Sequence, residues 1–335
     1  MAVLEIKDLK ITYTTRKGSA RAVDGVSFTI GEGEYLGIVG ESGCGKSTLA
    51  KAILGVLPPA GRVSGGEILY KGEDLAKLDE RGLNRLRWKE IALIPQSAMN
   101  GFDPVYRITE QIEEAIDAHD TWPAERKKAR IEEMFALVGL ERSRLNDYPH
   151  QFSGGMRQRA MIAMALVLDP TLVVADEPTT GLDVIVQDQI LYRIKQIHDR
   201  LRKTMLLITH DMPVVSENCD KIVVMYAGKI MEYGGKAVFR TPYHPYTLGL
   251  CNAFPDLGGE ARDLISIPKS PPDLLSPPPG CRFASRCPFA TDECRKAEPP
   301  MREVQPGHVA ACHHLDQVER FRREAAEPDT WRRVA

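Results

Sequence analysis

The sequence predicts an α/β fold whose core is a largely parallel sheet covered by helices. Four short apolar runs predict strands of this sheet, at residues 35–39, 91–94, 172–175 and 205–208. Runs that are almost continuously apolar are typical of parallel strands buried on both faces. Segments with a helical pattern alternate with these runs, and they predict the helices that cover the sheet.

The size and composition exclude several classes of protein. Of the 335 residues, 43% are hydrophobic and 27% are charged, which is the balance of a folded chain rather than a disordered one. The 44 lysines and arginines nearly balance 46 aspartates and glutamates, so we expect no nucleic-acid partner. The longest apolar stretch, residues 160–168, is far shorter than the roughly 20 residues of a membrane-spanning helix. The N-terminus carries no readable secretory signal, and we expect a cytoplasmic protein.

Two smaller units are predicted beside the core. Alternating apolar and polar residues at 4–11 and 26–30 predict half-exposed antiparallel strands, and hence a β subdomain. Helical patterns at 108–118 and 124–138 predict a helical subdomain inserted at about residues 97–169. We expect these parts to form one domain over residues 1–235.

The remaining residues, 236–335, predict a loop-rich C-terminal extension. Thirteen of the 23 prolines of the chain lie between residues 241 and 306, a density that forbids long helices and central strands. Proline runs at 271–272 and 277–279 favour an extended linker that leads into a cluster of cysteines.

The most specific motif follows the first predicted parallel strand. It matches the phosphate-binding loop pattern Gly-x-x-x-x-Gly-Lys-Ser in full and opens a predicted helix. The glycines let backbone N–H groups turn toward a phosphate, Lys46 reaches the β- and γ-phosphates, and the Ser47 hydroxyl ligates Mg²⁺. The nucleotide-binding residues expected here are Gly40, Glu41, Ser42, Gly43, Cys44, Gly45, Lys46, Ser47 and Thr48.

Two adjacent carboxylates, Asp176 and Glu177, end the predicted strand at 172–175. A metal-bound nucleotide needs an acid at this place, so we expect Asp176 to hold Mg²⁺ through water. Glu177 is then placed to polarise the attacking water.

A second anion-binding helix start is predicted at Ser153, Gly154, Gly155 and Met156. With this motif, residues 4–235 resemble the ATP-binding subunits of ABC transporters, and we expect a P-loop NTPase core of the ABC type. The resemblance implies a head-to-tail dimer in which this signature of one subunit closes over the γ-phosphate held by the other. Met156 stands where glutamine is commonest in that family. We expect activity to be retained, because Ser153 and the glycine amides still donate to phosphate.

The same resemblance implies roles for four further residues. Tyr13 matches the aromatic residue that stacks on adenine, and Gln96 the glutamine that contacts Mg²⁺ and the attacking water. Asp183 matches the characteristic acid of a loop at the dimer interface. His210 matches the switch histidine that contacts the γ-phosphate. Glu177, His210 and Gln96 are therefore the expected catalytic residues, with Ser47, Gln96 and Asp176 around Mg²⁺.

Within that family, the chain is similar to the ATP-binding subunits of dipeptide and oligopeptide importers. The similarity rests on His244-Pro245-Tyr246-Thr247 and on the cysteines of the extension. It implies an ATPase that powers peptide import, while importers of oligosaccharides and nickel chelates belong to the same subfamily. A different class, the soluble ABC ATPases of DNA repair or translation, is disfavoured because the chain has no sustained heptads and only one phosphate-binding loop. We expect His244 to be a turn residue rather than a catalytic one.

Cys281, Cys287, Cys294 and Cys312 supply four thiols in a loop-rich setting, enough for a tetrahedral metal site or an iron–sulfur cluster. They lack the Cys-x-x-Cys pair that is typical of zinc sites. The resemblance to peptide importers implies a 4Fe–4S cluster, with zinc as the alternative. We expect His308, His313 and His314 to be solvent-facing loop residues, with the alternative that one of them substitutes as a ligand. Because these cysteines lie far in sequence from Lys46 and Glu177, we expect the extension and the nucleotide site to act separately.

The resemblance also implies the partners. They are a second, homologous ATP-binding subunit in a heterodimer, two transmembrane permease subunits and an extracytoplasmic solute-binding protein reached through the complex. The chain is then expected on the cytoplasmic face of the inner membrane, as a peripheral subunit.

Overall fold

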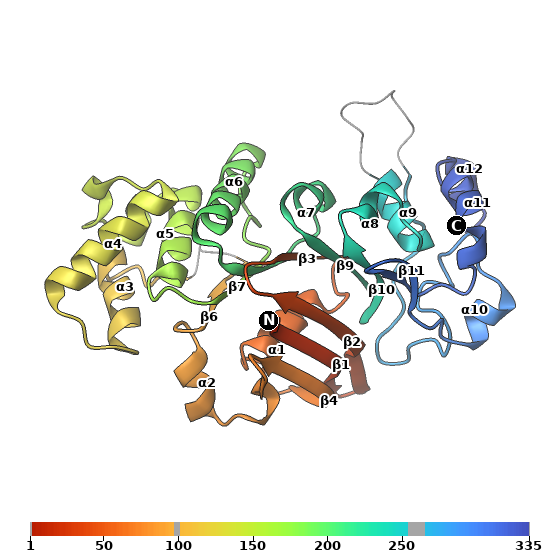
Figure 1. Cartoon of the computed structure of the whole chain (residues 1–335), viewed down its shortest axis with the longest axis horizontal. Coiled ribbons are helices and arrows are strands. Elements are labelled where there is room, and N and C mark those ends of the chain that lie inside the picture. The colour runs from red at the N-terminus through yellow and green to blue at the C-terminus, as the bar shows by residue number, and fades with distance from the viewer. Residues whose placement is uncertain (1, 97–100, 254–264, 335) are drawn as a thin grey trace.

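The computed structural model describes residues 2–96, 101–253 and 265–334, and it places two sheets side by side (Figure 1). The larger sheet has the order β11-β12-β10-β9-β3-β8-β7-β6, and the smaller has the order β2-β1-β4-β5. The larger sheet contains β3 (Tyr35–Val39), β6 (Ile91–Ile94), β7 (Leu172–Asp176), β8 (Thr204–Ile208), β9 (Lys221–Tyr226), β10 (Lys229–Gly235), β11 (Arg302–Gln305) and β12 (His308–Ala310). The smaller contains β1 (Ala2–Thr15), β2 (Gly18–Gly31), β4 (Gly61–Tyr70) and β5 (Glu73–Asp74).

The parallel core is confirmed. Strands β6, β7, β8, β3 and β9 pair in parallel, and all five residues of β3, β7 and β8 are buried. The antiparallel β subdomain is also confirmed, since β1 pairs antiparallel with both β2 and β4.

The helices range from four residues in α8 to 18 in α6. They are α1 (Lys46–Ile53), α2 (Glu80–Leu86), α3 (Ile108–Asp117), α4 (Ala124–Val138), α5 (Gly154–Leu166), α6 (Val184–Leu201), α7 (Met212–Asn218), α8 (Ala237–Arg240), α9 (Pro245–Asn252), α10 (Asp292–Lys296), α11 (Val318–Glu324) and α12 (Pro328–Arg332). The expected helical subdomain corresponds to α3, α4 and α5, which lie together at one end of the molecule (Figure 1). Residues 97–100 of the expected insertion lie outside the described residues.

Strand β3 divides the interior into two cores because its side chains alternate between the two faces of the sheet. Tyr35 and Val39 pack with apolar residues of α3 to α6, and Leu36 and Ile38 pack with those of α1 and the smaller sheet. The helices α1 and α5 therefore cover opposite faces of the larger sheet.

The C-terminal extension adds two strands to the larger sheet, which the proline density did not predict. Strand β12 pairs with β10, and β11 pairs with β12. The expectation that His308 faces solvent is wrong: its side chain is buried, and Nε2 lies 2.7 Å from Oε1 of Glu232 in β10. Pairing of β12 against β10 places His308 next to this carboxylate.

None of the helices in the part of the chain that the structure describes is both long and apolar enough to cross a membrane.

Candidate nucleotide-binding site

The expected phosphate-binding loop connects β3 to α1. Gly40, Gly43 and Gly45 have positive φ values of 154°, 77° and 108°. At Gly45 a Cβ atom would lie only 2.3 Å from the backbone oxygen of Ala22, so both the conformation and the close approach require glycine. The loop is thus packed against β2.

Lys46 lies inside this loop. Its ammonium group donates to the backbone oxygens of Gly40, at 2.7 Å, and Glu41, at 3.1 Å, and the side chain is buried. An ammonium group held this way can exchange carbonyl oxygens for phosphate oxygens. The thiol of Cys44 is buried beside Gly40, and burial raises its pKa, so Cys44 fills space as a neutral side chain.

Ser47 and Asp176 meet across the sheet edge. The Ser47 hydroxyl donates to Oδ1 of Asp176 at 2.9 Å, although 129 residues separate them in the sequence. Burial raises the pKa of Asp176, since the charged form has few water molecules around it. A divalent cation would relieve that cost, and hydroxyl and carboxylate oxygens are the ligands that Mg²⁺ prefers.

Glu177 is the centre of a polar group at the end of β7. Its carboxylate accepts from Nε2 of Gln96 at 3.0 Å and from Oγ1 of Thr180 at 3.1 Å, and Nδ1 of His210 lies 3.7 Å away. Glu177 has φ +46°, a conformation uncommon for a residue with a side chain. The structure thus brings together the three residues that were expected to be catalytic, and it adds Thr180.

Tyr13 lies at the edge of the loop. Its hydroxyl is 3.4 Å from Oγ1 of Thr48, and its ring lies so close to Gly61 that a Cβ there would be 2.7 Å from Cε1. The ring is half-buried beside the start of α1.

The signature residues form a capped helix start. The hydroxyl of Ser153 accepts from the amide of Met156 at 3.3 Å, which makes Ser153 the N-cap of α5. A Cβ on Gly155 would lie 2.5 Å from Cγ1 of Val186, so the first turns of α5 and α6 are in close contact. Asp183 is the N-cap of α6 and accepts from the amide of Val186 at 3.0 Å.

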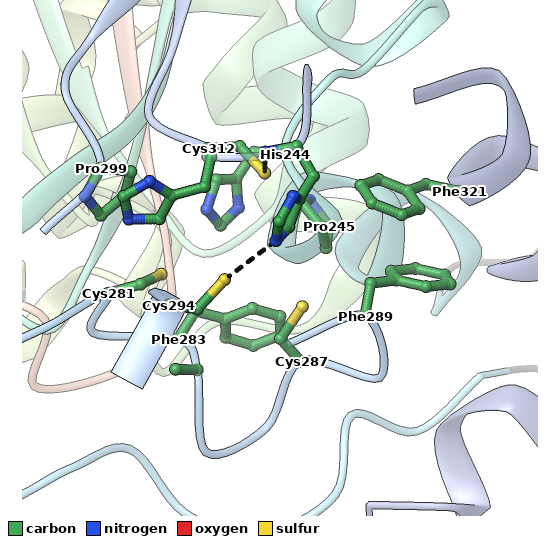
Figure 2. Close-up of a pocket in the computed structure, with 13 residues that line it drawn as sticks. His244, Pro245, Cys281, Phe283, Cys287, Phe289, Cys294, Pro299, Cys312 and Phe321 are labelled. Carbon is green, nitrogen blue, oxygen red and sulfur yellow. Dashed lines mark hydrogen bonds between the residues drawn. The ribbon is translucent and has the colours of Figure 1, made fainter. Parts of the chain in front are cut away.

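The cysteines of the extension converge. Cys281, Cys287, Cys294 and Cys312 are buried, are not in disulfides and line one pocket together with aromatic and proline side chains (Figure 2). His244 lines it too, but as the N-cap of α9, whose amide at Tyr246 donates to Nδ1 at 3.0 Å. His313 and His314 are also among the lining residues, and Nε2 of His314 lies 3.5 Å from Sγ of Cys294, so the expectation that both face solvent is wrong. The fold of residues 281–314 around the thiols turns these imidazoles inward.

No group of three or more His, Cys, Asp or Glu side chains among the described residues is arranged to hold a metal ion. The four thiols share a pocket without closing on a single point. The geometry of the thiols in the described part of the chain therefore supports neither the expected 4Fe–4S cluster nor zinc.

The extension also reaches the phosphate-binding loop, which sequence reasoning missed. The guanidinium of Arg286 donates to the Glu41 carboxylate at 2.7 Å, across 245 residues of sequence. No local pattern signals such a contact. The two are thus in contact despite their distance in sequence, and their separate action stays a prediction.

Comparisons with known proteins agree with the interpretation of this site as a nucleotide-binding site. Residues 23–180 match the family model described as ABC transporter, and residues 231–294 match the one described as oligopeptide/dipeptide transporter, C-terminal region. The chain is 45% identical to a probable peptide ABC transporter ATP-binding protein, y4tR, of Sinorhizobium fredii, over 94% of this chain and 96% of the relative. It is also 45% identical to the oligopeptide transport ATP-binding protein OppD of Escherichia coli, over 93% of each chain.

Solved structures show the same fold. The dimeric structure of MJ0796, a bacterial ABC transporter cassette, superposes with a TM-score of 0.63 at 28% identity, over 70% of this chain and 98% of that one. The structure of cbiO1 from Clostridium perfringens, part of the ABC transporter complex cbiONQ, gives a TM-score of 0.63 at 26% identity, over 71% and 91%.

The fold and the nucleotide site define a P-loop NTPase of the ABC type. Within that class, the chain belongs to the family of oligopeptide and dipeptide ABC transporter ATP-binding proteins. It is an ATPase, and ATP hydrolysis by this family energises transport.

Proposed function

We propose that this chain powers the import of dipeptides or oligopeptides. The observation that carries the proposal is the combination of an ABC nucleotide domain with a C-terminal region of the oligopeptide/dipeptide type in one chain. Relatives of nearly the same length are named for peptide transport. The alternative is that the same ATPase subunit powers the import of oligosaccharides or nickel chelates.

In the proposed site, the loop from Gly40 to Thr48 holds the phosphates of ATP, and Tyr13 stacks on adenine. Ser47, Asp176 and Gln96 surround Mg²⁺, which neutralises charge on the phosphates. Glu177 polarises the attacking water, and the 3.0 Å contact with Gln96 supports this role because it places both groups at one point. His210, 3.7 Å from the same carboxylate, contacts the γ-phosphate.

The working unit in this proposal is a head-to-tail dimer. In this dimer the signature Ser153, Gly154, Gly155 and Met156 closes over the ATP of a partner, and the position of α1 and α5 on opposite faces of the sheet is consistent with that proposal. Asp183, next to that signature at the start of α6, lies at the interface. We infer that the partner is a second, homologous ATP-binding subunit of different sequence.

The proposed complex also contains two transmembrane permease subunits and is fed by an extracytoplasmic solute-binding protein. The chain then works as a peripheral subunit on the cytoplasmic face of the inner membrane. In this organisation residues 1–235 bind and hydrolyse ATP, and residues 236–335 form the extension. The membrane itself is crossed by the permeases.

We further infer that the four cysteines hold a 4Fe–4S cluster. The chemistry of the donors supports this proposal, since four thiols line one largely apolar pocket and the amide of His314 donates to Sγ of Cys312 at 3.5 Å. Backbone amides of Phe283 and Ala284 likewise favour the thiolate of Cys281. N–H groups directed at sulfur are the surroundings that tune such clusters. A bound cluster would cross-link the loops of the extension.

The experiment that tests the transported solute is reconstitution of the complete transporter in lipid vesicles. We expect ATPase activity to rise when the binding protein is loaded with a dipeptide or a short oligopeptide. If only an oligosaccharide or a nickel chelate stimulates the ATPase activity, and peptides do not, the proposal of peptide import is wrong and the corresponding alternative holds.

A further inference from the structure

Glu41, the second residue of the phosphate-binding loop, is held at three points. Its carbonyl oxygen accepts from the amide of Cys44 at 3.3 Å and from the Lys46 ammonium at 3.1 Å, both within the loop. Its amide donates to the hydroxyl of Tyr246 at 3.0 Å, and its carboxylate accepts from Arg286 at 2.7 Å. Two of the three points therefore belong to the C-terminal extension.

Arg286 is built into the extension and has little freedom to move. It is 3% exposed, and its guanidinium also donates to the backbone oxygens of Pro268, at 2.7 Å, and Ile267, at 3.2 Å. A fourth bond reaches the hydroxyl of Tyr226, at the end of β9, at 3.2 Å. A fixed guanidinium presents a fixed donor, so Arg286 sets where the Glu41 carboxylate lies.

Tyr246 is equally fixed. Its side chain is fully buried, and its ring lies 4.7 Å from Tyr226 and 5.3 Å from Phe283, measured between ring centroids. Phe283 and Arg286 both come from the short loop between Cys281 and Cys287. The hydroxyl that accepts from the Glu41 amide is thus placed by packing within the extension.

We propose that Arg286 and Tyr246 are positioning residues that hold the phosphate-binding loop in the conformation that binds MgATP. This inference rests on the proposed nucleotide site, and it needs neither the identity of the solute nor a metal in the extension. Arg286 and Tyr246 act through Glu41. Without them, the loop samples conformations in which its amides do not converge on phosphate.

A positioning role changes affinity more than turnover. A preorganised loop loses less conformational entropy when it binds phosphate, so releasing it weakens the binding of ATP in ground and transition states alike. We expect the Kd for MgATP to rise about tenfold, or ~1.4 kcal/mol. The kcat of the assembled transporter should change much less than its KM for ATP.

The experiment measures MgATP binding to the full chain by titration calorimetry. The variants are R286Q and E41Q, which each break the ion pair, their double variant, and Y246F, which removes only the hydroxyl. If Arg286 acts through Glu41, the double variant binds no more weakly than the weaker single variant. R286K, which keeps the cation, should recover part of the affinity.

A second arginine from the same loop supplies the matched control. Arg282 is also 3% exposed and pairs with a carboxylate of the first part of the chain, but its partner is Asp24 in β2, at 2.5 Å, not the loop residue Glu41. The D24N variant therefore loosens the docking of the extension without touching Glu41. Breaking this buried pair lowers the stability of the fold, but since the partner of Asp24 is Arg282 and not Glu41, we expect the Kd of D24N for MgATP to stay within about twofold of wild type.

The outcomes separate the possibilities. Equal Kd values for wild type, R286Q, E41Q and Y246F, with all four folded by circular dichroism, would overturn the inference. An equal loss of affinity in D24N would also overturn it, because the effect would then be general docking. Should R286Q fail to fold, the Kd of Y246F for MgATP alone tests the inference. Absence of MgATP binding by the wild-type chain would instead refute the proposed nucleotide site.

Discussion

The imidazole of His308 lies 2.7 Å from the carboxylate of Glu232, and both side chains are buried. The same carboxylate accepts from the amides of Tyr243, at 2.8 Å, and His244, at 2.9 Å. One buried group thus ties strand β10 to strand β12 and to the start of α9. The extension is held to the core through this carboxylate as well as through its strand pairing.

We predict that H308A loosens the extension. Removing the imidazole leaves a buried carboxylate with one partner fewer, which costs about 3–5 kcal/mol when a buried pair is broken. Limited proteolysis should then cut the extension faster, and the melting temperature should fall. H150A is the control, since His150 is exposed. Equal proteolysis of the two variants would contradict the role given to the Glu232–His308 pair.

A second prediction concerns hydrolysis. E177Q should bind MgATP and close with its partner, while turnover at that site falls by about 10²-fold or more, because the amide no longer polarises water. Single-turnover assays must resolve the two sites of the proposed heterodimer, since the partner can keep its own activity. E217Q, at an exposed position of α7, is the control. Near-normal hydrolysis in E177Q would refute the role of Glu177 in polarising the attacking water.

The sequence alone was sufficient to predict the features that depend on neighbouring residues. The apolar runs predicted the parallel strands because burial on both faces leaves no room for polar residues. The loop from Gly40 to Ser47 was predicted because phosphate binding needs glycines at fixed spacing. These signals need no knowledge of distant segments.

The sequence did not predict the contacts that join distant segments of the chain. The pair of Glu232 and His308 spans 76 residues, and the pair of Glu41 and Arg286 spans 245. Strand β12 has only three residues, too few for a period to appear. Such contacts depend on how the proline-rich segment folds back, which composition does not specify.

A third prediction tests the signature. G155A should leave MgATP binding intact but reduce the ATPase activity of the assembled dimer by about tenfold or more, since the new methyl group collides with Val186 and shifts α5. Val186 is β-branched and has little rotamer freedom in a helix, so it does not move aside. Adding V186A makes room and should restore activity. Full activity of G155A alone would contradict this account of the helix contact.

A fourth prediction concerns assembly. A single chain carries one phosphate-binding loop and one signature, and in the proposed head-to-tail dimer the signature that closes over its γ-phosphate comes from the partner. The isolated chain should therefore hydrolyse ATP weakly, and addition of the partner subunit should raise the rate per site. Activity of a dilute, monomeric sample equal to that of the assembled transporter would refute the dimer.

The fifth prediction concerns the cysteines of the extension. Protein purified without oxygen should be brown and contain about four irons and four sulfides per chain, if the pocket holds a 4Fe–4S cluster. Serine at Cys281, Cys287, Cys294 or Cys312 should abolish the colour. C251S is the matched control, since Cys251 does not line that pocket. Stoichiometric zinc without iron would reject the cluster and keep the four-thiol site.

The pH dependence of cluster assembly follows from the state of the thiols before metal binds. Burial raises the pKa of Cys281 to about 11 and that of Cys312 to about 12, so both are protonated in the empty protein at neutral pH. Ligation requires thiolates, and it must therefore displace these protons. Reconstitution with iron and sulfide should become less complete as pH falls from 9 to about 6. A yield of cluster that is independent of pH over this range would show that the thiols are already ionised, and hence that their surroundings differ from the buried, apolar pocket seen here.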